Sequence, residues 1–317
     1  MKQNHIPQLN LDHFLSENPA QEQQFVRALG KAFSDVGFVA IRGDFLDWKA
    51  IDLLYEQIQL FFGLPQSIKD RYCITDGAGQ RGYTSFGKES AKGQKVGDLK
   101  EFWHFGPELK ANSPYGTLYP KNVTVEELPL FNSMGKECFE VFQKIAREVL
   151  RALAQYLELP ETYFDSYIGE GNSILRAIHY PPISEEPNDA LRAAAHGDIN
   201  LITLLVGAQG AGLQVQNRQG EWVEAAAEAD EILINIGDML SRLSNNRLRS
   251  TVHRVVNPPR NQWHTSRYSI PFFLHPVPDM PLNCLEHLVD EKHPKAYPDC
   301  TAGEFLEERL HELGLKS

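Results

Sequence analysis

The chain has 317 residues, of which 42% are hydrophobic and 23% are charged. This is the composition of a globular protein, and a chain of this length buries enough apolar surface to fold without disulfide bonds or a structural metal. The 31 Lys and Arg residues against 42 Asp and Glu residues give a net charge of -11. We therefore expect no nucleic-acid partner and no binding to an anionic membrane.

The cysteines and the first residues indicate the cellular compartment. Cys73, Cys138, Cys284 and Cys300 lie far apart and form no CxxC pair, which argues against a zinc ribbon, a thioredoxin motif and a disulfide framework. The opening residues MKQNHIP lack the apolar core of a signal peptide, and no apolar stretch approaches the ~18 residues of a membrane span. These features predict a soluble cytoplasmic protein, either an enzyme or a small-molecule binder.

The first part of the chain shows mixed helical and strand patterns. In chain order, the patterns predict a short strand at 6–11, a helix at 25–36, a strand at 38–41 and a helix at 51–61. Gly37 is expected to end the first of these helices. Residues 74–123 are rich in Gly, Lys, Ser and Pro, and we expect a long, partly ordered loop there.

The second half of the chain changes character after a third predicted helix at 131–157. Short β-rich runs separated by Gly and Pro turns follow at 174–180, 201–206, 213–216, 232–236, 250–256 and 268–274. Many short strands with this spacing favour a jelly roll, and a last helix is predicted at 302–313. The fold class is thus mainly β with flanking helices and an N-terminal α/β region. The expected segments are 1–125 (N-terminal region), 126–171 (supporting helix), 172–280 (jelly-roll core) and 281–317 (C-terminal helix).

One constellation in the second half has the chemistry of a metal site. His196 is the only histidine of 11 that is followed two residues later by an aspartate, Asp198. In a strand, residues i and i+2 share a face, so this imidazole and carboxylate can converge, and His253 lies on another predicted strand. Two imidazoles and one carboxylate form the facial triad of non-haem Fe(II) oxygenases, which leaves coordination positions open. Taken singly, the His-x-Asp pair also fits a surface hydrogen bond, and His253 fits a packed core histidine.

A third element lies 14 residues beyond His253. Arg267 and Ser269 share one face of a predicted strand, and a guanidinium beside a hydroxyl is suited to bind a small dicarboxylate. A second Arg-x-Ser occurs at Arg242 and Ser244. No clear strand pattern surrounds Arg242, so we expect it to be a solvated surface charge.

The region from Ile174 to Pro276 resembles the isopenicillin N synthase-like family of Fe(II)/2-oxoglutarate-dependent oxygenases. Besides the motifs above, the matching blocks are LITLL at 201–205, GLQV at 212–215, GEW at 220–222, INIGD at 234–238, LSN at 243–245, STVHRV at 250–255 and RYSIPFF at 267–273. The N-terminal region is similar to that of the family in IP at 6–7, GF at 37–38, RGY at 81–83 and DLKE at 98–101.

The resemblance implies a double-stranded β-helix and a defined set of ligands. Fe(II) would be held by two histidines and one aspartate, and 2-oxoglutarate would chelate the iron while its distal carboxylate pairs with an arginine and a serine. The residues at these positions are His196, Asp198 and His253 for the metal, and Arg267 and Ser269 for 2-oxoglutarate. Asp238 and Trp222 are expected to be structural.

Tyr180 matches a tyrosine that lies near the co-substrate in the family, although an aromatic packed at a strand end before Pro181 is an equal alternative. Many relatives carry Asn two residues before this tyrosine, where the chain has Ile178. This departure concerns how the iron-proximal carboxylate of 2-oxoglutarate is held and leaves the iron site unaffected.

The implied activity is oxidation, most simply hydroxylation, of a small molecule with O2, while 2-oxoglutarate is decarboxylated to succinate. Two alternatives stay open: a 2-oxoglutarate-independent Fe(II) oxidase or cyclase of the isopenicillin N synthase type, and a non-catalytic jelly-roll binder. No acid or base side chain beyond the metal ligands is required.

The prime substrate is expected to be an amino-acid derivative or a natural product. Candidate lining residues are Arg81, Tyr83, Phe102, Trp103 and Phe273, each of which could equally be packing. Arg81 could receive a substrate carboxylate. We expect His104 and His179 to serve in packing or in support of the site.

Overall fold

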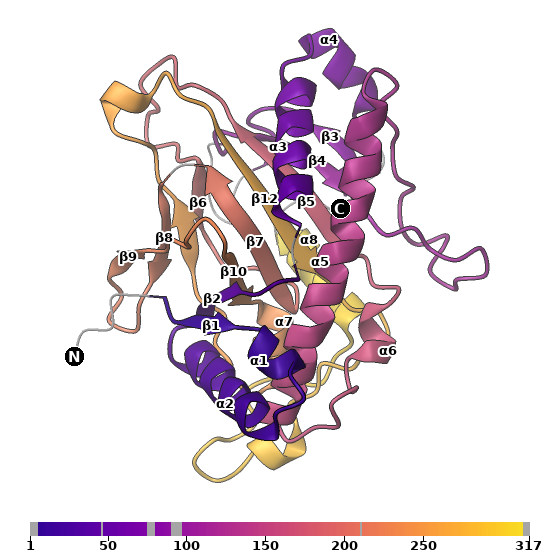
Figure 1. Cartoon of the computed structure of the whole chain (residues 1–317), viewed down its shortest axis with the longest axis vertical. Coiled ribbons are helices and arrows are strands. Elements are labelled where there is room, and N and C mark those ends of the chain that lie inside the picture. The colour runs from indigo at the N-terminus through magenta and orange to yellow at the C-terminus, as the bar shows by residue number, and fades with distance from the viewer. Residues whose placement is uncertain (1–5, 46, 75–79, 90–96, 210, 313–317) are drawn as a thin grey trace.

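The computed structural model describes residues 6–45, 47–74, 80–89, 97–209 and 211–312. Two β-sheets form its centre, and long helices cover the outer side of the larger sheet (Figure 1). The larger sheet has the order β1 (Gln8–Asn10), β2 (Phe38–Arg42), β10 (Ile232–Ile236), β7 (Ile202–Gln209), β12 (Arg267–Leu274), β5 (Ile174–Tyr180), β4 (Glu101–Phe105) and β3 (Gly82–Thr84).

The smaller sheet has the order β6 (Ala193–His196), β11 (His253–Val255), β8 (Leu213–Gln216) and β9 (Trp222–Glu224). Apolar side chains of both sheets meet between them and exclude water from this space, among them Phe38 and Leu233 from the larger sheet and Val215 and Val255 from the smaller. The predicted double-stranded β-helix with flanking helices is confirmed.

The helices, in chain order, are α1 (Asp12–Leu15), α2 (Pro19–Asp35), α3 (Trp48–Phe62), α4 (Gln66–Lys69), α5 (Pro129–Tyr156), α6 (Asp165–Ile168), α7 (Asp238–Leu243) and α8 (Ala302–Glu312). Short 3-10 turns lie at Asp70–Tyr72, Arg260–Gln262 and Glu286–Leu288. The predicted segment boundaries at 125 and 171 stay a prediction. The larger sheet contains strands from before residue 125 and from after residue 171.

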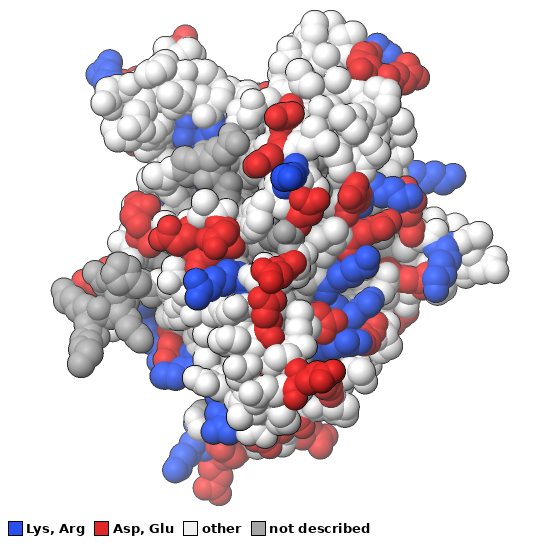
Figure 2. Space-filling model, in the orientation of Figure 1, with Lys and Arg blue, Asp and Glu red and all other residues white. Residues whose placement is uncertain are grey.

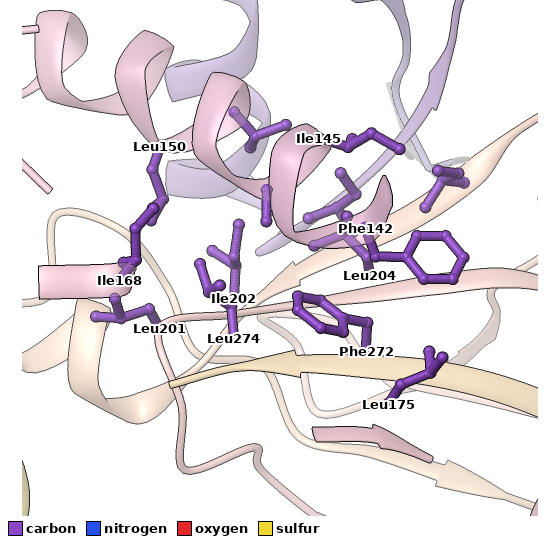
Figure 3. Packing of buried hydrophobic residues seen from close by; sticks show 14 of the residues in the cluster. Phe142, Ile145, Leu150, Ile168, Leu175, Leu201, Ile202, Leu204, Phe272 and Leu274 are labelled. Atoms are coloured by element: carbon purple, nitrogen blue, oxygen red, sulfur yellow. The ribbon is translucent and has the colours of Figure 1, made fainter. Parts of the chain in front are cut away.

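Helix α5 buries its apolar stripe against the larger sheet. Its buried residues recur every three or four positions, including Phe142, Ile145 and Leu150, so they lie on one face of the helix. Figure 3 shows Phe142 close to the sheet residues Leu204 and Phe272, and Leu150 close to Ile168 and Leu201. This core holds the outer side of β12 and β5 in place and leaves their inner side for the site.

Residues 74–123, predicted to be a long and partly ordered loop, also contain the strands β3 and β4, and their parts at 75–79 and 90–96 lie outside the described residues. All five residues of β4 are buried although Glu101 and His104 are among them. A strand that is buried on both faces has no polar-apolar alternation, and its charged residues hide it further.

Gly37 ends α2 as predicted and also allows a close approach of two chain segments. Its φ is 78°, and a Cβ there would lie 2.3 Å from Oγ1 of Thr251. Thr251 donates a hydrogen bond from that hydroxyl to the carbonyl of Val36 (2.8 Å). The contact anchors the segment that leads directly into His253 of β11.

Within the described residues, no helix combines the length and apolarity needed to cross a membrane. Figure 2 shows Asp and Glu side chains interspersed with Lys and Arg over one face of the molecule.

Candidate metal and co-substrate site

The smaller sheet brings His196 and His253 together, and Asp198 follows two residues after His196. His196 is the last residue of β6 and lies opposite His253, the first residue of β11, in the antiparallel register. One ligand atom of each of the three residues lies within 4.8 Å of those of the other two, and Nε2 of His253 is 3.8 Å from Oδ1 of Asp198. Three donors at this spacing can reach a single metal ion placed between them.

Hydrogen bonds to the backbone fix the orientation of both imidazoles. Nδ1 of His196 donates to the carbonyl of Ala194 (2.7 Å), and Nδ1 of His253 donates to the carbonyl of Thr251 (3.1 Å). A carbonyl can only accept, so each Nδ1 carries the proton and each Nε2 has a lone pair free for a metal.

Two side chains of the larger sheet position the carboxylate of Asp198. Oγ1 of Thr203 and Nδ2 of Asn235 both donate to its Oδ2, at 2.6 and 2.8 Å. Its Oδ1 is the oxygen nearer His253. Thr203 lies in the LITLL block, but its role and that of Asn235 depend on contacts between strands that a linear pattern does not contain.

The electrostatic surroundings favour the protonation states that a metal requires. Burial lowers the pKa of His196 to about 4, so the imidazole is neutral near pH 7. Burial by itself would raise the pKa of Asp198, but the two histidines and the hydrogen bonds from Asn235 and Thr203 outweigh it, and the pKa is lowered. A neutral imidazole and an ionised carboxylate are metal ligands as they stand.

Arg267 and Ser269 lie on the inner side of β12, opposite Tyr180 and Ile178 of β5. The Arg267 residue is 2% exposed, and its Nε and Nη1 have no hydrogen-bond partner among the described residues. Its guanidinium lies 5.0 Å from the ring centre of Tyr180. Buried N–H groups without an acceptor carry a free-energy cost that a bound carboxylate would remove, so these residues fit the distal end of a dicarboxylate.

A second arginine, which the sequence pattern did not reveal, lies near Tyr180. The guanidinium of Arg192 lies 5.9 Å from the same ring centre and donates to the carbonyl of Thr265 (3.1 Å). Burial lowers the pKa of Arg192 to about 10, with a further contribution from the charge of Arg267. Arg192 precedes β6, a strand of small residues that the analysis did not predict.

A cavity of about 600 Å³ adjoins the triad, and its wall includes His196 and Asp198. Phe102 and Phe273, two of the predicted lining residues, also belong to this wall. The structure brings none of the other three to it. The wall also includes Asp238, which was expected to be purely structural, and burial raises the pKa of this carboxyl.

The alternation of β3 and β4 explains why Tyr83 and Trp103 lie elsewhere. Tyr83 is opposite Trp103 in the register, so both side chains project to the side away from the cavity. The ring of Trp103 packs against Phe61, at 4.9 Å between ring centres, and is fully buried in the core. The predicted lining role is corrected for both residues.

Arg81 is also outside the cavity wall. Its Nη2 donates to Oδ1 of Asn172 and its Nη1 donates to the carbonyl of Gln80, both at 2.6 Å. The side chain is buried next to the wall, where the pKa of Arg81 is lowered to about 10 by burial. The predicted lining role is therefore corrected for Arg81 as well.

Arg242 is not the solvated surface charge that the sequence predicted. It lies on α7, is 8% exposed, and its guanidinium packs over the rings of Tyr297 and Phe305. Its Nη2 donates to the carbonyl of Pro298. The C-terminal segment that covers this helix could not be foreseen from the local pattern.

Trp222, by contrast, lies on β9 under the guanidinium of Arg254, as suits a hairpin aromatic.

Arg176 is the arginine that does line the cavity, and the sequence analysis did not select it. It shares a face of β5 with Ile178 and Tyr180, because these residues are two positions apart. Its guanidinium lies 4.2 Å from the ring centre of Phe102 and 5.2 Å from that of Phe273. Its Nε donates to Nε2 of His104 (2.6 Å), which gives His104 the supporting role that was expected.

His179 points to the opposite side of β5 from Arg176. Its Nδ1 is 2.8 Å from Oε1 of Glu101, and its Nε2 is 3.0 Å from the hydroxyl of Ser266. This histidine is thus engaged in packing and hydrogen bonding away from the triad.

A double-stranded β-helix with two histidines and an aspartate at the mouth defines the class of non-haem iron oxygenases. Comparison with known proteins identifies the family. Residues 171–276 match the 2OG-Fe(II) oxygenase superfamily, and residues 6–127 match the family described as non-haem dioxygenase in morphine synthesis N-terminal.

Similar proteins cover nearly the whole chain. The chain is 32% identical to proline hydroxylase buaE of Petromyces alliaceus, over 96% of its own length and 98% of the relative. A crystal structure of a 2OG-Fe(II) oxygenase family protein from Caulobacter crescentus has a TM-score of 0.88 at 39% identity and covers 97% of this chain and 99% of that one. The crystal structure of a full-length Neurospora crassa protein in complex with alpha-KG and thymine has a TM-score of 0.84 at 28% identity, with 98% of each chain covered.

The chain therefore belongs to the 2OG-Fe(II) oxygenase superfamily, in the isopenicillin N synthase-like branch with the N-terminal dioxygenase region. Its cofactors are Fe(II) and 2-oxoglutarate, and it is an oxidoreductase.

Proposed function

We propose that the chain hydroxylates a small molecule, with Fe(II) held by His196, Asp198 and His253 and 2-oxoglutarate held by Arg267, Ser269 and Tyr180. The observation that carries the proposal is the convergence of three metal-type donors beside a buried arginine whose Nε and Nη1 lack an acceptor in the described part of the chain. When bound, Fe(II) and 2-oxoglutarate supply the oxidation, in which O2 is consumed, 2-oxoglutarate becomes succinate and CO2, and one oxygen atom enters the substrate.

The protein's own contribution is to fix the donors and to exclude water. Backbone carbonyls hold both imidazoles, so the site is preorganised at little cost when the ion binds. Arg267 fixes one end of the dicarboxylate, while the buried rings of Phe102 and Tyr180 shield the interior from solvent. No side chain outside the metal ligands is needed to move a proton.

The substrate would enter the cavity beside His196 and Asp198. A volume of about 600 Å³ suits a small molecule of the size of an amino-acid derivative or a compact natural product. The names of the relatives agree with that scale, since one is a proline hydroxylase and another has been crystallised with thymine.

An anaerobic optical titration with Fe(II) and then 2-oxoglutarate tests the proposal. The expected result is a visible metal-to-keto-acid charge-transfer band that is lost in His253→Ala and weakened in Arg267→Gln. Arg27→Gln is the matched control, because Arg27 lies exposed on α2 and should leave the band unchanged. Tight Fe(II) binding without such a band in the wild type would contradict the co-substrate assignment and favour a 2-oxoglutarate-independent oxidase.

A further inference from the structure

Several charged side chains on the cavity wall are already paired with one another. Nη1 and Nη2 of Arg176 lie 3.1 and 3.2 Å from the two carboxylate oxygens of Glu89. Nζ of Lys100 is 2.7 Å from Glu89 and 2.9 Å from Asp98. On another part of the wall, Arg309 lies 2.9 Å from Glu312. Separating one partner of a buried pair leaves an uncompensated charge and is strongly unfavourable.

The wall also includes polar side chains that carry no charge near pH 7, and one lysine at its rim. Burial lowers the pKa of His275 to about 4, so its imidazole is neutral near pH 7. Its Nδ1 is buried and has no hydrogen-bond partner among the described residues. Asn172 contributes an amide, and Lys88, which is exposed at the rim, is screened by water.

We propose that this cavity selects an uncharged small molecule with an amide-type edge, and that Arg176 and Glu89 bind that edge. The class includes lactams, imides and cyclic ureides, in which a carbonyl oxygen stands beside an N–H. The inference rests on the proposed function, since it concerns the substrate of the same site.

The donors and acceptors of this pair match such an edge. Arg176 has five N–H groups, and its contacts with His104 and Glu89 engage three of them; within the described residues this leaves one on Nη1 and one on Nη2, either of which can donate to a carbonyl oxygen. The carboxylate of Glu89 offers four acceptor positions, and Arg176 and Lys100 occupy three. The rings of Phe102 and Phe273 flank the guanidinium and provide an apolar wall for a ring.

An anionic substrate would find no buried and unpaired cation among the described residues of the wall. An amino acid or a carboxylate would have to separate Arg176 from Glu89 before it could bind to either of them. Arg81, which the sequence suggested as a carboxylate receptor, lies off the wall and is bonded to Asn172 and Gln80. The geometry therefore distinguishes between uncharged and charged small molecules, both of which the fold can accommodate.

The test uses the anaerobic Fe(II)·2-oxoglutarate complex of the full chain and follows the perturbation of its charge-transfer band by four probes. Thymine and succinimide represent uncharged molecules with an amide-type edge. Orotate carries a carboxylate on a similar ring, and L-proline is a zwitterion. We expect at least one uncharged probe to perturb the band at a concentration at least tenfold lower than either charged probe.

Two variants sharpen the test. Glu89→Gln keeps the size of the side chain and leaves Arg176 without its counter-charge, so it should bind orotate at least tenfold more tightly than the wild type does. Arg176→Met should lose the response to the uncharged probes while it keeps the 2-oxoglutarate band. Glu108→Gln and Arg27→Met, both at exposed positions, are the matched controls and should behave as the wild type.

The outcomes separate this inference from the proposed function. A wild type without a charge-transfer band would contradict the proposed function itself. With the band present, tighter binding of orotate or L-proline than of the uncharged probes overturns the inference, as does the absence of any response to thymine and succinimide. An unchanged response to the uncharged probes in Arg176→Met would overturn it too, because another part of the wall would then bind the substrate.

Discussion

The two sides of strands β4, β5 and β12 differ in composition and in what they contact. The outer side packs against helices and is apolar at its centre, with Trp103, Ala177 and Ile270 all buried in the main core. The inner side faces the smaller sheet and the cavity, and it carries Arg176, Tyr180 and Arg267. Neighbouring residues of one strand thus serve stability and chemistry in alternation, and a register shift of one residue would exchange the two roles.

This comparison teaches that distance along the chain says little about function here. Phe102 and Trp103 are adjacent aromatics, yet only Phe102 reaches the cavity. The residues that act together come instead from different strands at matching register positions, such as Arg267 and Tyr180. Substitutions on the two sides should therefore have separable effects.

The largest effect is expected from removal of a metal ligand on the inner side. His196→Ala eliminates one of three donors, and we expect loss of stoichiometric Fe(II) binding and of succinate formation below detection. Iron bound after anaerobic desalting provides the measurement. His293→Ala, at an exposed histidine, should retain one equivalent of iron, and equal iron content in both variants would refute the triad.

Removal of the anion-binding arginine should come next. Arg267→Ala leaves the distal carboxylate of 2-oxoglutarate buried without its cationic partner, which costs about 3–5 kcal/mol, or roughly a 150- to 4000-fold increase in Kd. Titration of the charge-transfer band with 2-oxoglutarate measures this Kd. 2-Oxovalerate lacks this carboxylate and should bind the wild type and the variant with similar affinity, so an equal loss for both keto acids would argue against the assigned contact.

On the outer side, Trp103→Ala should lower the free energy of unfolding by about 3–5 kcal/mol, because it creates a cavity in a closely packed aromatic cluster. Chemical denaturation measures this change. Below the unfolding transition, the affinity for 2-oxoglutarate should stay within about twofold of the wild type. A selective loss of that affinity in a stable variant would show that the two sides are coupled.

The smallest effect concerns the pH dependence of stability. The pKa of His275 is about 4 in the folded protein because of burial, against an ordinary value of 6.5. Between these values the unfolded chain binds more protons, so the free energy of unfolding falls as the pH falls from 6.5 to 4. His275→Phe in metal-free protein should remove at most about 3 kcal/mol of this dependence, at about 1.36 kcal/mol for each pKa unit. His293→Phe should leave it unchanged, and an identical pH profile in both variants would contradict the burial of His275 as a neutral group.

Local patterns predicted much of the fold. The runs 174–180, 213–216 and 232–236 coincide with β5, β8 and β10, because Gly and Pro turns delimit strands of β-branched and aliphatic residues. The placement of the His-x-Asp pair and of Arg267 and Ser269 on β12 likewise follows from the two-residue period of side chains in a strand. Strand β4 was missed because burial on both faces removes the alternation on which the prediction relies, and β3, with three residues, is too short to show a pattern.

The parts of the site that could not be predicted depend on three-dimensional neighbours. The position of Glu89 beside Arg176 joins segments 87 residues apart, and that of Asn235 beside Asp198 joins segments 37 residues apart. Without the register of β3, β4 and β5, nothing in the sequence distinguishes Arg81 from Arg176 as the arginine on the wall. Arg176 lies on the cavity side of β5, whereas Arg81 directly precedes β3 and is bonded to Asn172 and Gln80.

The most direct test of the central claim is a crystal structure of the anaerobic complex with Fe(II) and 2-oxoglutarate, with anomalous scattering measured at the iron edge. The account predicts one strong anomalous peak bounded by Nε2 of His196, Oδ1 of Asp198 and Nε2 of His253, with the distal carboxylate of 2-oxoglutarate on the guanidinium of Arg267. An anomalous peak at any other group of residues, or a keto acid that does not contact Arg267, would contradict it.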